Sequence, residues 1–135
     1  MPHEVVNPES LGAPRGYSNG ILAAKGRLLF VAGQIAWDGT RVVAEDFVAQ
    51  FGKALDNALA VVEAAGGGPA SVARLTMYVT DKREYLGALP AVGAAYRARM
   101  GRHFPAMALV EVSALVEPAA KIEIEATAVI EDRDD

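Results

Sequence analysis

The sequence predicts an α+β domain, in which a mixed β-sheet carries helices on one of its faces. Three observations predict this class: helical periodicity in two separate segments, alternation of apolar and polar residues near the C-terminus, and glycine-containing turns between the elements. The elements follow one another as three strands, a helix, a strand, a helix and two strands, which predicts a six-stranded sheet with two helices on one face. The chain has 135 residues without a linker or a repeat, so we expect a single domain over residues 1–135.

The N-terminal half predicts a hairpin followed by a long helix. Residues 20–25 and 28–32 are predicted to pair as neighbouring strands, with Lys25-Gly26 supplying the turn. From Asp46, which suits an N-cap, apolar residues recur at helical spacing. The run Gly66-Gly67-Gly68-Pro69 then ends this helix.

The C-terminal half predicts a strand, a second helix and two further strands. Residues 75–80 alternate apolar and polar side chains, which is typical of a half-buried strand. Pro90 suits the first turn of a helix that runs to about Met100. Residues 107–113 are largely apolar, and residues 121–130 alternate. Helices cover only one face of such a sheet, so the apolar residues on its other face predict association of subunits.

The composition excludes several classes of function. The chain has no cysteine, which excludes disulfides, thiolate nucleophiles and cysteine-based zinc sites. His3 and His103 lie far apart without a metal-ligand spacing, so we expect no metal and no cofactor. A formal net charge of −4 argues against nucleic-acid binding. Neither a signal peptide nor a membrane-spanning stretch is visible, so we expect a cytoplasmic protein that does not act at a membrane.

Several short motifs, in order and with compatible spacing, resemble the pattern of one known family. They are GYSN at 16–19, LFVAGQI at 29–35, the helix segment at 50–66, TMYVTD at 76–81, FPA at 104–106, VEV at 110–112 and IEIEA at 122–126. Over nearly the whole chain this pattern resembles the Rid/YjgF (L-PSP, UK114) family. The resemblance implies the chorismate-mutase-like fold, a homotrimer whose sheets form a central barrel, and sites for a small molecule in the clefts between subunits. For the best-known branch it also implies hydrolysis of enamines and 2-imino acids to 2-oxo acids and ammonia.

Position 107 distinguishes this chain from that branch. There, an arginine follows Phe-Pro-Ala and binds the substrate carboxylate, whereas this chain has Met107, and Gly93 replaces an asparagine. A guanidinium–carboxylate contact contributes about 1.5–3 kcal/mol per bond. Its loss is expected to weaken transition-state binding of a small imino acid roughly 10- to 100-fold. We therefore predict a divergent branch that handles small 2-imino acids poorly, unless Lys25, Arg15 or Arg102 supplies the charge.

Glu123 is the candidate catalytic residue. Hydrolysis of a C=N bond needs a held water and a proton route to the departing nitrogen, and a carboxylate can supply both. The resemblance places this glutamate in the cleft, whereas Glu125, on the same strand face, is interpreted as structural. Tyr17 offers a ring and a hydroxyl to a ligand, and a glycine lets a ligand approach the backbone closely. The candidate substrate-binding residues are Tyr17, Ser18, Gly33, Gln34, Met107 and Leu109.

Three functions remain as alternatives at this point. The first is an enamine or imine deaminase whose substrate carries no small carboxylate or presents it differently. The second is a non-catalytic trimeric protein that binds a small metabolite in the same clefts. The third is the ribonuclease activity attached to the family name, which fits poorly with a negatively charged chain that lacks a histidine pair and a basic groove.

Overall fold

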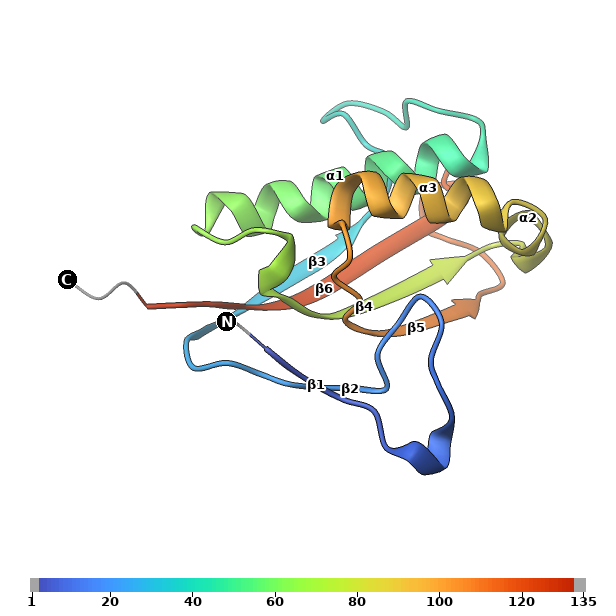
Figure 1. Ribbon diagram of the computed structural model, residues 1–135. Coiled ribbons are helices and arrows are strands. Elements are labelled where there is room, and N and C mark those ends of the chain that lie inside the picture. Colours follow the sequence, from blue (N-terminus) through green and yellow to red (C-terminus); the bar gives the residue numbers. More distant parts are fainter. Residues whose placement is uncertain (1–2, 133–135) are drawn as a thin grey trace.

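The computed structural model describes residues 3–132 and places a single layer of helices over one face of a sheet (Figure 1). The strands, in chain order, are β1 (Glu4–Val6), β2 (Gly20–Leu22), β3 (Arg27–Gln34), β4 (Val72–Val79), β5 (Ala106–Glu111) and β6 (Ile122–Ile130). The helices are α1 (Phe47–Ala64), α2 (Lys82–Leu86) and α3 (Leu89–Met100), with short 3-10 turns at Glu9–Leu11 and Pro69–Ser71. No helix among residues 3–132 is long and apolar enough to cross a membrane.

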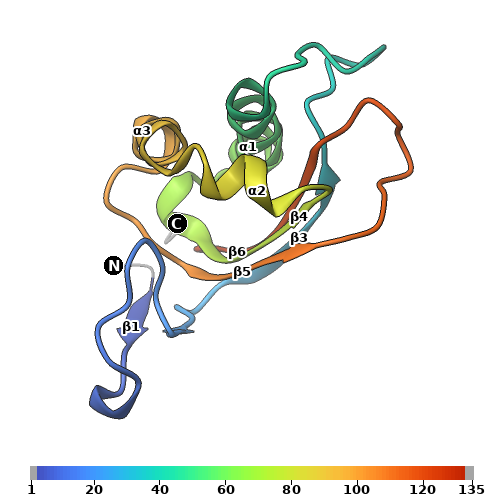
Figure 2. The same cartoon turned by 90° about the vertical axis from the view of Figure 1, so that its right-hand side faces the viewer.

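The main sheet has four strands in the order β3-β6-β4-β5. Strands β4 and β5 run parallel, and β6 is antiparallel to both of its neighbours, β3 and β4. Helices α1 and α3 lie side by side across one face of this sheet, and the other face is left uncovered by helices (Figure 2). The prediction of an α+β fold with a mixed sheet and helices on one face is therefore confirmed.

The predicted hairpin and the predicted single six-stranded sheet are wrong. Strand β2 pairs with β1 in a separate two-stranded sheet, and β3 pairs with β6 instead of with β2. The physical reason lies in burial: Val31 of β3 reaches the core beside Ala126 of β6, whereas the residues of β2 stay at least partly exposed. A turn signal near Gly26 marks a change of direction but does not decide which strands pair.

Helix α1 begins and ends where the sequence predicts. The Asp46 carboxylate accepts a hydrogen bond of 3.0 Å from the Ala49 N–H and so caps the N-terminus. At the other end, Gly66 has a φ of 97°, a left-handed conformation that glycine adopts without strain. Along one side, α1 buries large apolar residues against the sheet and α3. They are Phe47, Phe51, Leu55, Leu59 and Val62.

The sheet has one buried face and one open face. Ile122 and Ile124 of β6 point into the core under the helices. The open face carries Leu28 and Phe30 of β3, which are 63% and 73% exposed. Val110 of β5, at the opposite edge of the same sheet, is 44% exposed.

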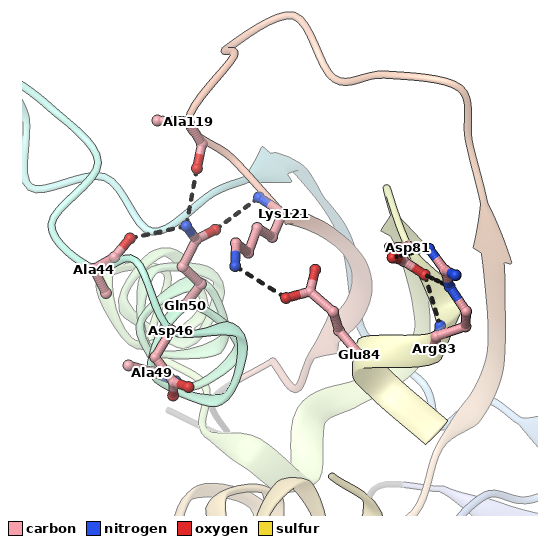
Figure 3. Close-up of polar contacts among 9 residues, drawn as sticks. All are labelled: Ala44, Asp46, Ala49, Gln50, Asp81, Arg83, Glu84, Ala119 and Lys121. Atoms are coloured by element: carbon pink, nitrogen blue, oxygen red, sulfur yellow. Dashed lines mark hydrogen bonds and ion pairs between the residues drawn. The ribbon is translucent and has the colours of Figure 1, made fainter. Parts of the chain in front are cut away.

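The Gln50 side chain links helix α1 to the segment that precedes α1 and to the segment that precedes β6. Its side chain is fully buried on α1, and its Nε2 donates to the carbonyl oxygens of Ala44 and Ala119 at 2.8 and 2.9 Å. Its Oε1 accepts a hydrogen bond of 2.8 Å from the Lys121 N–H (Figure 3). A single amide thus satisfies three backbone groups in the segments before α1 and before β6.

We predict that Gln50→Leu lowers the free energy of unfolding by about 2–4 kcal/mol, because it leaves three backbone groups without their partner. Urea denaturation measures the change. The control is Glu63→Leu, which replaces an exposed polar residue on the same helix and is expected to change the value by less than about 0.5 kcal/mol. Equal effects of both substitutions would show that the buried network does not stabilise the fold.

Candidate ligand-binding site

A cavity of about 600 Å³ lies between α3, β5 and the loop that precedes β2. Most of its wall is apolar and aromatic, and two arginine side chains belong to the lining. The residues that matter for its chemistry are Arg15, Tyr17, Tyr96, Arg97, Phe104, Met107 and Leu109. A second hollow, of about 890 Å³, lies between the loops at 41–45 and 113–121 and contains none of the predicted site residues.

Ser18 fixes the loop that carries Tyr17. Its N–H donates to the Pro105 carbonyl oxygen at 3.1 Å, and its buried hydroxyl donates to the Phe104 carbonyl oxygen. Ser18 also forms an isolated parallel bridge to Ala106, the first residue of β5. These bonds hold Tyr17 against the cavity, where its side chain is 40% exposed. We therefore interpret Ser18 as the residue that positions Tyr17, and a direct contact of Ser18 with a ligand stays a prediction.

An aromatic pair forms the wall at the C-terminal end of α3. The rings of Tyr96 and Phe104 stack with centroids 5.5 Å apart and planes 9° from parallel. The Tyr96 hydroxyl donates to the His103 carbonyl oxygen at 2.7 Å. Burial raises the pKa of Tyr96 well above its ordinary value, so the phenol remains a neutral donor in this contact.

Met107 and Leu109, both predicted to bind the substrate, lie in the cavity wall. They pair in register with Leu75 and Met77 of β4, and all four side chains point toward the helices. The cavity therefore presents a thioether and not a guanidinium at position 107. Of the predicted replacement cations, Arg15 lines the cavity, whereas Lys25 and Arg102 do not.

Gly33, Gln34 and Glu123 lie away from this cavity, and Glu123 is on the open face of the sheet. Its register partner there is Tyr78 of β4, which alternates with the core residues Met77 and Val79. Gly33 is close to the Glu123 carboxylate: a Cβ at position 33 would lie 2.7 Å from its Cδ, so any side chain there would require the carboxylate to move. The Gln34 amide donates to the Ala32 carbonyl oxygen at 3.0 Å.

The two glutamates of β6 differ in their surroundings. The Tyr78 hydroxyl donates to Oε1 of Glu125 at 2.8 Å, whereas the Glu123 side chain has no hydrogen bond or ion pair within residues 3–132. The hydrogen bond to Glu125 is the main cause that raises the pKa of Tyr78, followed by desolvation and the charges of Glu125 and Glu123. Glu125 is thus engaged within the sheet, and the Glu123 carboxylate is free to act on a ligand or a water.

The chain therefore holds two separate groups of predicted residues. Tyr17, Met107 and Leu109 belong to the cavity on the helix side, and Glu123 with Gly33 belongs to the open face. Within the described part of the chain, no cluster of three His, Asp or Glu side chains is arranged to hold a metal ion. Sequence reasoning missed Arg97 and placed no site residue on α3, because an arginine near a helix end resembles an ordinary solvated residue.

Known proteins with similar sequences or structures support one family assignment. The family model described as endoribonuclease L-PSP matches residues 8–130. The 2-iminobutanoate/2-iminopropanoate deaminase of Salmonella typhimurium is 40% identical over 108 residues, which cover 77% of this chain and 80% of that protein. Protein DfrA of Myxococcus xanthus is 35% identical over 94% of this chain and 92% of its own length. The crystal structure of YyfB from Yersinia pestis, a conserved Rid protein of unknown function, superposes with a TM-score of 0.85 at 36% identity, covering 96% of this chain and all of that one.

We predict that Glu125→Gln lowers the pKa of Tyr78 toward 10.0, because the substitution removes the carboxylate that accepts the phenolic hydrogen bond. Alkaline titration of the tyrosinate absorbance, with Tyr78→Phe subtracted, isolates this group. The hydrogen bond stabilises the fold below pH 10 and is lost as the pH rises through the raised pKa. Glu123→Gln is the matched control and is expected to lower the pKa of Tyr78 less than Glu125→Gln does. An equal or larger decrease in the control would contradict the assignment of the raised pKa to the hydrogen bond with Glu125.

Proposed function

Since the chain belongs to the Rid/YjgF (endoribonuclease L-PSP) family, we propose that it hydrolyses an enamine or imine to a carbonyl compound and ammonia. The observation that carries this proposal is the separation of the Glu123 carboxylate from the ligand cavity within one subunit. The lining of the cavity contains no carboxylate, and Glu123 does not belong to it. A complete site follows when one subunit brings its Glu123 face to the cavity of its neighbour.

We further propose that the assembly is a homotrimer with three such inter-subunit sites. The exposed Leu28 and Phe30 support association through the open face of the sheet, because burying these side chains in a neighbouring subunit removes apolar surface from water. Closed symmetric association would also turn Glu123 away from bulk solvent. A carboxylate in such a partly dry cleft is suited to proton transfer.

In the proposed reaction, Glu123 acts first as a base and then as an acid. The carboxylate accepts a proton from a water molecule while the water oxygen attacks the imine carbon and the C=N electron pair moves to nitrogen, and Glu123 then returns that proton to the nitrogen. The carbinolamine that results then collapses: Glu123 takes the proton of its hydroxyl and delivers it to the departing nitrogen as the carbonyl forms and the C–N bond breaks, which releases ammonia. An enamine enters the same sequence after protonation at carbon. Tyr17 closes one side of the cleft and offers its hydroxyl as a hydrogen-bond donor.

Met107 distinguishes this site from one built for small imino acids. The relatives named as deaminases act, by their names, on 2-iminobutanoate and 2-iminopropanoate. With a methionine where a carboxylate-binding arginine is expected, this cavity offers no cation at that position of β5. We therefore propose a substrate other than these short 2-imino acids. The same methionine favours a second candidate, a protein that binds a metabolite in the cleft without converting it.

We predict that Glu123→Gln lowers kcat for imine hydrolysis by about 100-fold or more, because an amide cannot take the proton from water. Coupled measurement of ammonia release from freshly generated imines and enamines follows the reaction. Glu125→Gln, an isosteric change on the same strand face, serves as the control and is expected to retain most activity. Full activity of Glu123→Gln would remove this residue from the mechanism, and no wild-type activity on any imine would favour the binding protein.

We predict that Met107→Arg raises kcat/KM for 2-iminopropanoate roughly 10- to 100-fold, since it introduces a guanidinium for the substrate carboxylate. Met107→Leu keeps the wall apolar and should leave the value unchanged. The same ammonia assay compares the three proteins. Wild-type turnover of 2-iminopropanoate as fast as that of Met107→Arg would contradict the proposed change of substrate.

A further inference from the structure

We propose that Arg97 and Arg15 bind the carboxylate of a substrate whose bulky apolar body occupies the cavity between α3 and β5. This inference rests on the proposed function and deepens it, because it names the class of imine: a 2-imino or enamine carboxylate with a large apolar or aromatic side chain. The carboxylate of this substrate then lies against the guanidinium groups of Arg97 and Arg15, neither of which belongs to β5. The apolar body of the substrate lies against Met107.

The charge of the cavity lining points to an anionic ligand. Two arginines, Arg15 and Arg97, contribute to the lining, and no aspartate or glutamate does. This local charge is opposite to that of the whole chain, which is −4. A concentration of guanidinium groups without carboxylates in a concave site is typical of carboxylate or phosphate recognition.

Arg97 differs from its neighbour Arg99 in having no internal partner. Arg99, on the same helix, donates to the Asp56 carboxylate of α1 at 2.7 Å and is thereby occupied. The side chains of Arg97 and Arg15 form no hydrogen bond or ion pair within residues 3–132. Both side chains are exposed, so a ligand can reach them without breaking a contact in the fold.

The Arg97 guanidinium lies beside Gly93. The guanidinium folds back along α3 by one turn, and a Cβ at position 93 would lie 3.0 Å from its Nη1. Helical side chains point toward the N-terminus of their helix, which brings the end of Arg97 over position 93. The absence of a side chain at Gly93, which also belongs to the cavity lining, leaves room for the guanidinium beside the ligand.

The size and lining of the cavity select the apolar part of the substrate. A volume of about 600 Å³ is within the usual range for small-molecule sites and exceeds what a three- or four-carbon imino acid fills. Leu89, Val92, Phe104 and Met107 provide apolar wall, and the stacked Tyr96–Phe104 pair provides an aromatic surface. An apolar or aromatic side chain on the substrate would bury itself here while its carboxylate remains at the guanidinium groups.

Binding of phenylpyruvate tests the assignment without requiring turnover. Phenylpyruvate is the stable 2-oxo acid that corresponds to the imine of phenylalanine, so it presents the carboxylate and the aromatic body together. Isothermal titration calorimetry is expected to show at least tenfold tighter binding of phenylpyruvate than of pyruvate or inorganic phosphate. Arg97→Gln and Arg15→Gln should each weaken phenylpyruvate binding roughly tenfold, and Arg97→Lys should restore part of the loss.

Arg102→Gln is the matched control, because Arg102 follows α3 and is exposed but does not line the cavity. It should leave phenylpyruvate binding unchanged. Circular dichroism and the mass of the assembly in solution check that all variants fold and associate as the wild type does. Loss of binding in Arg102→Gln equal to that in Arg97→Gln, or pyruvate and phosphate binding as tightly as phenylpyruvate, would overturn the inference.

Ammonia release from the imine of phenylalanine separates this inference from the proposed function. Arg97→Gln is expected to raise KM about tenfold for that imine and to leave KM unchanged for an imine without a carboxylate. If phenylpyruvate binding depends on the arginines but no imine is hydrolysed, the result would support the ligand class and contradict the proposed deaminase activity. A KM for this imine that does not change in Arg97→Gln or Arg15→Gln would leave the deaminase activity in place and overturn the assignment of Arg97 and Arg15.

Discussion

The alternation of side chains along β6 is the constraint on which the rest of the structure depends. This strand is paired on both sides, so its residues must point either into the core under the helices or onto the open face. Ile122 and Ile124 occupy the core, and their burial forces Glu123 and Glu125 outward. A shift of one residue would bury two carboxylates and expose the isoleucines, at a cost that the fold could not offset. The placement of the candidate catalytic carboxylate is therefore a consequence of core packing, and not of local contacts of Glu123 itself.

The parts of the fold that follow from local periodicity could be predicted from the sequence. Helix α1 and the alternation of β4 and β6 are set by residue patterns within each segment, and the cap at Asp46 is a local contact. Strand pairing is different, because a turn signal such as Lys25-Gly26 does not say whether the strand that follows returns to its neighbour. The N-terminal pair of strands and the pairing of β3 with β6 depend on contacts between distant segments, which no local pattern contains.

The candidate site shows the same division between local and distant information. The strand face shared by Met107 and Leu109 follows from their spacing, and the structure places both in one cavity. The role that we propose for Arg97 could not be predicted in this way, because it rests on the position of the side chain beside Gly93 and on a cavity lining without carboxylates. An unpaired arginine and an ion-paired one look alike in a sequence. Arg99, two residues later, is held by Asp56, and only the packing of α3 against α1 distinguishes the two.

The hydrogen bonds of Ser18 fix the loop before β2 to the start of β5. Two hydrogen bonds and a parallel bridge join the loop to residues 104–106, so Tyr17 and Met107 are carried by connected pieces of backbone. The spacing between these two sides of the cavity is then fixed by the sheet edge. The opposing side belongs to α3, whose surface residues contact the sheet less directly. Substitutions on the exposed side of α3 can therefore change the shape of the cavity while the sheet and the position of Glu123 stay unchanged.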